Sequence, residues 1–152
     1  MSTLACGCPG SQVRTIERNA PTETAPTGTQ PSELRQWPTQ LHLVPPSAPY
    51  LQHAHLLIAA DCAPFAYADF HRDFIKGRVL VNACPKLDDT SPYIDKLAAI
   101  IAQNDIQSVT VTIMEVPCCR GLAMFAQKAV EQSGKNVPLE IVVIGVDGTR
   151  RS

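Results

Sequence analysis

The feature that most constrains the fold is the alternation, from Trp37 onward, of short apolar runs with amphipathic stretches. Each apolar run is short and rich in Val, Ile and Leu, which is typical of strands buried on both faces. The runs cover residues 40–44, 55–60, 78–83, 108–114 and 140–146. Between the later runs, apolar residues recur every three or four positions, as they do in helices. These stretches cover residues 62–77, 91–105 and 121–135.

Strands that alternate with helices of this length are joined by right-handed crossovers in a parallel sheet. We therefore expect a three-layer α/β domain with a flavodoxin- or Rossmann-like parallel sheet of about five strands. The helix boundaries agree with this pattern. Ser91 is expected as an N-cap with Pro92 at the first helical position, and Gly77 and Gly134 are expected to end helices.

The first 36 residues differ in composition from the rest of the chain. Residues 12–36 contain few apolar side chains and many Pro, Thr and Glu, so they cannot bury enough surface to offset their ordering entropy. We expect residues 1–36 to be a cysteine motif with a flexible linker, and residues 37–152 to be the folded domain. A length of 152 residues with 45% hydrophobic residues suits one such domain.

Charge and hydropathy exclude two classes of partner. A formal net charge of −1 leaves no basic excess for a nucleic-acid backbone. No apolar run approaches the roughly 18 to 20 residues that span a bilayer. The first ten residues also lack the cationic and apolar regions of a signal peptide. We expect a cytoplasmic protein without membrane or nucleic-acid contacts, and the sequence leaves the oligomeric state open.

Four of the six cysteines directly follow predicted strands. Cys62 follows residues 55–60, Cys84 follows residues 78–83, and the adjacent pair Cys118 and Cys119 follows residues 108–114. The carboxyl ends of parallel strands share one edge of a sheet, where ligands bind. We therefore expect these thiols, distant in the sequence, to be neighbours in space. Cytosolic cysteines are more often metal ligands or redox thiols than disulfides.

The chemistry expected at that edge favours anionic sulfur. Helix N-termini lower the pKa of cysteine, and the same N–H groups donate to the sulfurs of an iron-sulfur cluster. We predict an iron-sulfur cluster, with 4Fe-4S first; because five or six thiols exceed the four that a simple cubane uses, a larger or second cluster is the alternative. The predicted ligands are Cys62, Cys84, Cys118 and Cys119. Free cysteine is also a common apolar filler, but filler has no reason to choose one edge.

Two further cysteines precede the linker. Cys6 and Cys8 form a Cys-x-Cys motif followed by Pro-Gly, which suits a ligand turn. A flexible chain of about 28 residues is long enough to bring this motif to the sheet edge. Cys8 is the first reserve metal ligand, and Cys6 is included among the cofactor-binding candidates.

Other polar residues suggest no separate site. The four histidines lack the spacing of a zinc site or a catalytic triad. They are His42, His53, His55 and His71. Asp61, Asp88 and Asp89 lie beside the cysteine loops, where capping is their expected role. Neither glycine-rich nucleotide-binding motif is present.

Several long blocks resemble iron-sulfur cluster-binding proteins of anaerobic bacteria and archaea, known as ferredoxin-like or 4Fe-4S dicluster-domain proteins. The blocks are "CPGS" (8–11), "SELRQWPTQLHLVPPSAPY" (32–50), "LLIAADCAPFAYADFHRDFIKGRVLV" (56–81), "CPKLDD" (84–89), "EVPCC" (115–119) and "VVIGVDG" (142–148). The resemblance covers nearly the whole chain. It implies that five cysteines belong to the family pattern, namely Cys8, Cys62, Cys84, Cys118 and Cys119.

The chain departs from this family in three ways. The family's ferredoxin module is absent, so the resemblance implies a C-terminal domain whose redox partner is a separate ferredoxin or oxidoreductase. Arg120 stands where the family pattern has glycine, and Cys6 is an addition.

The sequence therefore predicts an iron-sulfur protein for electron transfer or redox sensing in anaerobic metabolism. One alternative is a thiol redox enzyme in which Cys118 and Cys119, or one of them with Cys62 or Cys84, cycles between dithiol and disulfide. Another is a structural zinc module with four thiolates. Whether the chain is an enzyme is left open.

Overall fold

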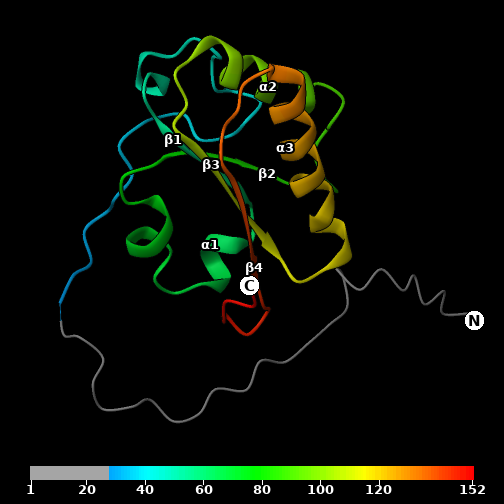
Figure 1. Ribbon diagram of the computed structural model, residues 1–152. Coiled ribbons are helices and arrows are strands. Elements are labelled where there is room, and N and C mark those ends of the chain that lie inside the picture. Colours follow the sequence, from blue (N-terminus) through cyan, green and yellow to red (C-terminus); the bar gives the residue numbers. More distant parts are fainter. Residues whose placement is uncertain (1–27) are drawn as a thin grey trace, which may run out of the picture.

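Four of the five apolar runs form parallel strands of one sheet in residues 28–152, which the computed structural model describes (Figure 1). The strands are β1 (His55–Ala60), β2 (Val79–Ala83), β3 (Ser108–Met114) and β4 (Leu139–Ile144). Their order across the sheet is β2-β1-β3-β4. In the register, Ile58 of β1 lies between Val81 of β2 and Val111 of β3.

Helices cover both faces of the sheet, as expected for three layers. The helices α2 (Tyr93–Gln103) and α3 (Arg120–Ser133) lie side by side on one face. The short helix α1 (Ala63–Ala66) and the π-helical turn η3 (His71–Ile75) lie on the other (Figure 1). Right-handed crossovers require this, because the chain moves in one direction across the sheet from β1 to β2 and in the opposite direction from β2 to β3 and β4.

Burial on both faces explains why the strands lack polar alternation. Five consecutive residues of β1, from Leu56 to Ala60, are buried, and six of the seven residues of β3 are buried. Leu56, Leu57 and Ile58 are fully inaccessible. The core therefore lies on both sides of the two central strands.

The strand predicted at residues 40–44 is wrong. Gln40 makes an isolated parallel bridge with Asn82, and the chain then turns, with the N–H groups of Leu43 and Val44 both donating to the Gln40 carbonyl. Leu41 and Val44 are buried while Leu43 is exposed, which is the pattern of a turn. The Pro-Pro pair at 45–46 lacks the N–H groups that would continue a ladder.

The helix predicted at residues 62–77 is interrupted. It ends at Ala66, and Tyr67 is extended, with φ −98° and ψ 113°. The Tyr67 ring packs edge-on against Phe74 at a centroid distance of 5.1 Å, and its hydroxyl donates to Asp73 at 2.6 Å. Packing these rings together requires the second turn, η3, to start in a new direction. Gly77 follows this turn with φ 76°.

The other helix boundaries follow the prediction more closely. Gly134 ends α3 in the left-handed conformation, with φ 71°. At α2 the N-cap residue is Pro92 rather than Ser91. The Ser91 N–H and hydroxyl both donate to the Asp89 carboxylate, at 3.1 and 2.8 Å, so this serine does not cap the helix.

The predicted N-terminal motif and most of the predicted linker, residues 1–27, lie outside the described residues. Gln36, at the end of that linker, is buried, and its side-chain amide donates to the Leu80 carbonyl at 2.6 Å. The boundary between residues 36 and 37 stays a prediction. Within residues 28–152, no helix combines the length and apolarity needed to cross a membrane.

Candidate functional site

Four cysteine side chains line a single cavity of about 410 Å³ at one edge of the sheet. Cys62 follows β1, Cys84 follows β2, and Cys118 and Cys119 follow β3. All four thiols are free; Cys62 is exposed and Cys119 is buried. The predicted convergence of these distant residues is therefore seen in the fold, and their role as ligands stays a prediction.

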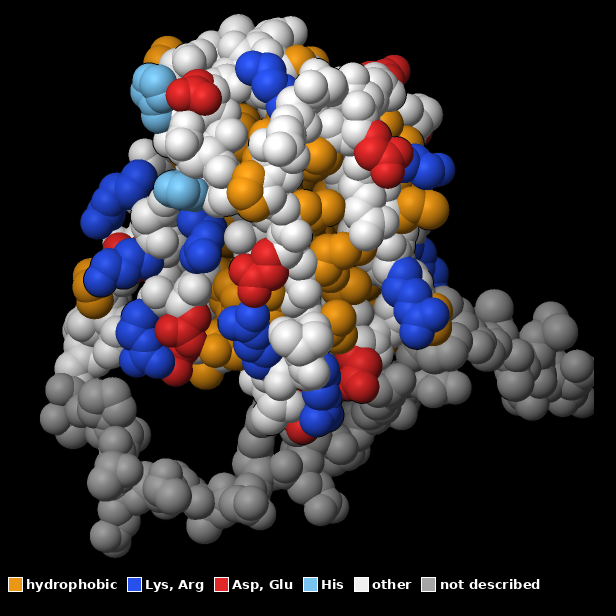
Figure 2. Space-filling view, in the orientation of Figure 1, with side chains coloured by type: hydrophobic (Ala, Val, Ile, Leu, Met, Phe, Trp, Pro, Cys, Tyr) orange, Lys and Arg blue, Asp and Glu red, His pale blue; other side chains and the backbone are white. Residues whose placement is uncertain are grey.

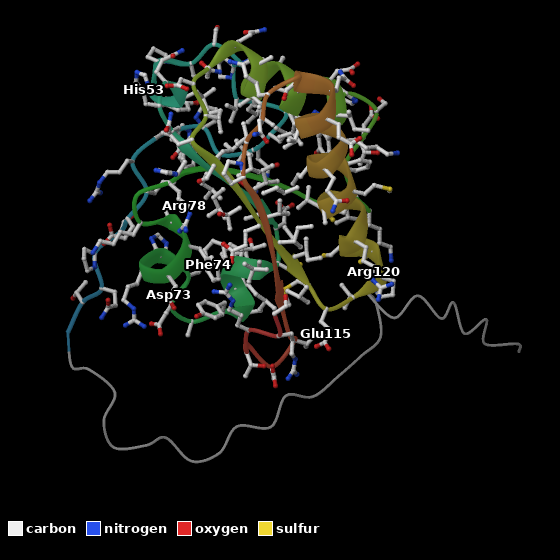
Figure 3. All side chains as sticks on the ribbon, in the orientation of Figure 1. His53, Asp73, Phe74, Arg78, Glu115 and Arg120 are labelled. Atoms are coloured by element: carbon white, nitrogen blue, oxygen red, sulfur yellow. The ribbon has the colours of Figure 1, made fainter. Side chains whose placement is uncertain are left out.

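The strand order explains why the cavity lies here. β2 and β3 lie next to β1 on its two opposite sides within the sheet. The loops after β1 and β3 therefore turn toward opposite faces of the sheet. Ligands of open parallel sheets bind in the crevice between such loops. Figure 3 shows Glu115 and Arg120 at this end of the molecule and His53 at the opposite end.

Cys62 is fixed by an extension of the sheet. The N–H of Asp61 donates to the Ala83 carbonyl at 3.1 Å, which continues the ladder between β1 and β2 by one residue. The Asp61 carboxylate accepts a hydrogen bond from the Asn82 side chain at 2.7 Å. Asp61 therefore joins the two strand ends instead of capping a helix, and Cys62 follows directly.

Cys118 and Cys119 lie at the start of the long helix α3. The 3₁₀ turn η4 (Pro117–Cys119) precedes this helix, and the Cys119 N–H donates to the Val116 carbonyl at 3.1 Å. A helix N-terminus has a positive potential that favours anionic sulfur. The tight turn also explains how two adjacent side chains reach one cavity.

The pKa values of two thiols are higher than expected. Burial, then the neighbouring Cys84, Asp61 and Cys118, raise the pKa of Cys62. Burial also raises the pKa of Cys119 to about 11, while a hydrogen bond from the Met114 main chain acts in the opposite direction. The predicted lowering of the pKa is therefore wrong for these two thiols, because desolvation is the largest cause of the raised pKa and neighbouring anionic groups add to it.

We expect the metal-free protein to lose stability between pH 9 and pH 11. Burial raises the pKa of Cys119 from the ordinary value of 9.0 to about 11, so with rising pH the unfolded chain releases this proton before the folded chain does, and the unfolded state is stabilised relative to the fold. Cys119→Ala should reduce this loss by roughly 2 to 3 kcal/mol. Urea unfolding of reduced wild-type and variant proteins across this range measures it, and parallel pH profiles would contradict the assignment.

The remaining cavity wall is largely apolar, with one acidic side chain, Asp61, and one basic side chain, Lys86. It includes Lys86, Leu87, Met114, Val116 and Val146. Leu87 is 83% exposed. Sequence reasoning missed Lys86 and Met114, although Lys86 stands two residues after Cys84 and Met114 ends the strand before the vicinal pair.

None of the four histidines lines this cavity. His53 hydrogen-bonds Asp105 at 2.7 Å, and both residues precede strands. His55 hydrogen-bonds Ser108 at 2.7 Å, and these are the first residues of β1 and β3. Among residues 28–152, no three His, Cys, Asp or Glu side chains are grouped closely enough to hold one metal ion. Cys6 and Cys8 lie outside the described part of the chain.

A C-terminal turn lies next to the cavity and is held by ion pairs. Arg151 pairs with Glu115 at 3.1 Å and with Asp147 at 3.2 Å. Val146, in the same turn, forms part of the cavity wall. Figure 2 shows acidic and basic side chains interspersed over this face of the molecule.

Comparisons with known proteins agree with the fold. The profile of the Rossmann-like domain family matches residues 48–150. An uncharacterized protein of Archaeoglobus fulgidus is 36% identical over 116 residues, which cover 76% of this chain and 81% of that protein. No solved structure matches the chain. These matches name the fold family and no cofactor, and the chain belongs to the Rossmann-like domain family.

Proposed function

We propose that the chain binds an iron-sulfur cluster in the thiol cavity and serves in electron transfer or redox sensing. The observation that carries the proposal is the convergence of four thiols, from three strand ends, on one cavity. The proposed ligands are Cys62, Cys84, Cys118 and Cys119, with Cys8 in reserve and Cys6 as a further cofactor-binding candidate. When bound, a cluster would supply one-electron chemistry, and the chain would hold it and set its surroundings.

The donor set and the cavity suit a polynuclear centre. Four cysteine thiolates are the usual ligand set of a 4Fe-4S cluster. A structural zinc ion needs all four sulfurs about 2.3 Å from a single point. Here the thiols lie around the wall of a cavity of about 410 Å³. Apolar neighbours such as Val116 and Val146 would lower the polarity around a bound cluster, which tunes a reduction potential.

The electrostatics of the cavity also favour a cationic occupant. Burial and neighbouring anionic groups raise the pKa of Cys62 and Cys119, so four bare thiolates would repel one another. Iron bound between them would remove this repulsion. The Asp61 carboxylate lines the same cavity and adds negative potential.

The two alternatives receive less support. A redox-active dithiol needs a thiol with a lowered pKa, whereas burial raises the pKa of Cys62 and of Cys119. A structural zinc site usually stabilises domains with small cores, and this domain already buries an extensive apolar core around its sheet. We keep both alternatives as outcomes of the test below.

Iron and acid-labile sulfide analysis of anaerobically purified protein tests the proposal. We expect a brown protein with about four irons and four sulfides per chain, as in a cubane cluster. One zinc per chain without sulfide would support the structural zinc site instead. Metal-free protein with a titratable disulfide would support the thiol enzyme, and either result would contradict the cluster.

We also propose that a separate redox protein, either a ferredoxin or another oxidoreductase, exchanges electrons with the cluster. The cavity supports this because it opens at the surface, where Cys62 is exposed. A bound cluster would therefore lie close to a docked partner.

A further inference from the structure

A side-chain clamp closes the loop that carries Cys84. The Cys84 N–H donates to Oδ2 of Asp88 at 2.9 Å. In return, the Asp88 N–H donates to the Cys84 carbonyl at 3.0 Å. These two hydrogen bonds tie both main-chain polar groups of Cys84 to one residue, so the position of Asp88 determines the backbone position of Cys84.

Asp88 is itself anchored to the helical layer. The Tyr93 hydroxyl donates to the same Oδ2 atom that accepts the Cys84 N–H. Tyr93 is the first residue of α2 and is fully buried. Its ring packs against His42 at a centroid distance of 4.7 Å and edge-on against Phe125 at 6.2 Å. The carboxylate is therefore fixed by a side chain that has little freedom to move.

The opposite side of the loop rests near α3. A Cβ atom placed on Gly121 would lie 3.5 Å from Cβ of Pro85, an ordinary van der Waals contact. Gly121 belongs to the first turn of the helix that follows Cys118 and Cys119. The loop is thus tied to α2 through Asp88, and Pro85 lies near the start of α3.

We propose that Asp88, held by Tyr93, is the positioning residue that fixes Cys84 in the wall of the thiol cavity. As regards metal binding, this inference rests on the proposed function. The geometry of the clamp does not depend on any metal. One consequence is that the Cys84 N–H already has an acceptor, so it is not free to donate to a cluster sulfur.

Alkylation of the metal-free, reduced full chain by iodoacetamide tests the clamp. The rate is measured separately for Cys62, Cys84, Cys118 and Cys119 by peptide mass spectrometry. Asp88→Ala should raise the Cys84 rate about tenfold, the factor that corresponds to one lost hydrogen bond of about 1.4 kcal/mol, and leave the other three rates within about twofold. Asp88→Asn, which keeps an acceptor oxygen, should restore the wild-type rate.

Two further variants complete the design. Asp89→Ala is the matched control, because Asp89 accepts hydrogen bonds from Ser91 and none from Cys84; its Cys84 rate should stay at the wild-type value. Tyr93→Phe removes only the hydroxyl and should give a rise between those of Asp88→Asn and Asp88→Ala. If Asp88→Ala does not fold, Tyr93→Phe decides the matter, and an unchanged Cys84 rate in Tyr93→Phe would then overturn the clamp.

The iron content and visible spectrum of the same variants separate this inference from the proposed function. The Asp88→Ala protein should contain less iron or have an altered visible spectrum. The Asp88→Asn protein should have the iron content and the spectrum of the wild type. A wild-type protein without iron, combined with a Cys84-specific rise in alkylation, would refute the cluster and leave the clamp standing. An unchanged Cys84 rate in Asp88→Ala, or an equal rise at all four cysteines, would overturn the clamp.

Discussion

Cys62→Ser or Cys84→Ser is expected to remove most of the iron from anaerobically purified protein. Both side chains line the cavity but come from different strand ends, so each should supply a separate ligand. A serine hydroxyl is not ionised near neutral pH and is a poor ligand for iron. The loss of iron affinity should exceed the roughly 10- to 100-fold loss that follows when a residue hydrogen-bonded to a ligand is changed. Iron and sulfide per chain, after gel filtration, measure it.

The matched control is Met114→Leu. Met114 is another sulfur-containing side chain of the same cavity wall, and leucine has a similar volume. This variant should keep the wild-type iron content. Full iron content in either Cys62→Ser or Cys84→Ser would show that the proposed ligand set is wrong. Cys8→Ser, made in parallel, tests the reserve ligand.

Leu57→Ala should destabilise the fold more than any exposed substitution. Leu57 is fully buried in β1, where it lies between Leu80 of β2 and Thr110 of β3. Truncating a buried leucine costs about 2 to 5 kcal/mol, because both burial and packing are lost. Domains of ordinary size have a free energy of unfolding of only about 5 to 15 kcal/mol. Urea unfolding of the reduced, metal-free protein measures the loss.

Leu43→Ala is the control for this truncation. Leu43 is 64% exposed in the turn that replaces the predicted first strand. The same chemical change should shift the free energy of unfolding by no more than about 0.5 kcal/mol at this position. Equal losses at positions 43 and 57 would contradict the burial of β1, and a Leu57→Ala cost below about 1 kcal/mol would do the same.

Local patterns were sufficient to predict four strands and misleading at two other places. The runs at β1 and β3 are apolar without alternation because helices cover both faces, and that pattern is visible in the sequence. Residues 40–44 are also apolar, but the side chains of Leu41 and Val44 reach the core from a turn. The interruption near Tyr67 depends on its packing against Phe74, a contact that helical periodicity does not reveal.

The sequence by itself determined that Cys62, Cys84, Cys118 and Cys119 follow strands, because strand and helix periods are local properties of the chain. Parallel strands then place them at one edge. Only the tertiary structure decided the order β2-β1-β3-β4, which places the cavity beside the point where the crossovers diverge.

The tertiary structure also decided the hydrogen bonds between Asp88 and Cys84 and the raised pKa of Cys119. Hydrogen-bond partners and desolvation depend on which surfaces pack together, and this is a property of the whole fold rather than of any segment.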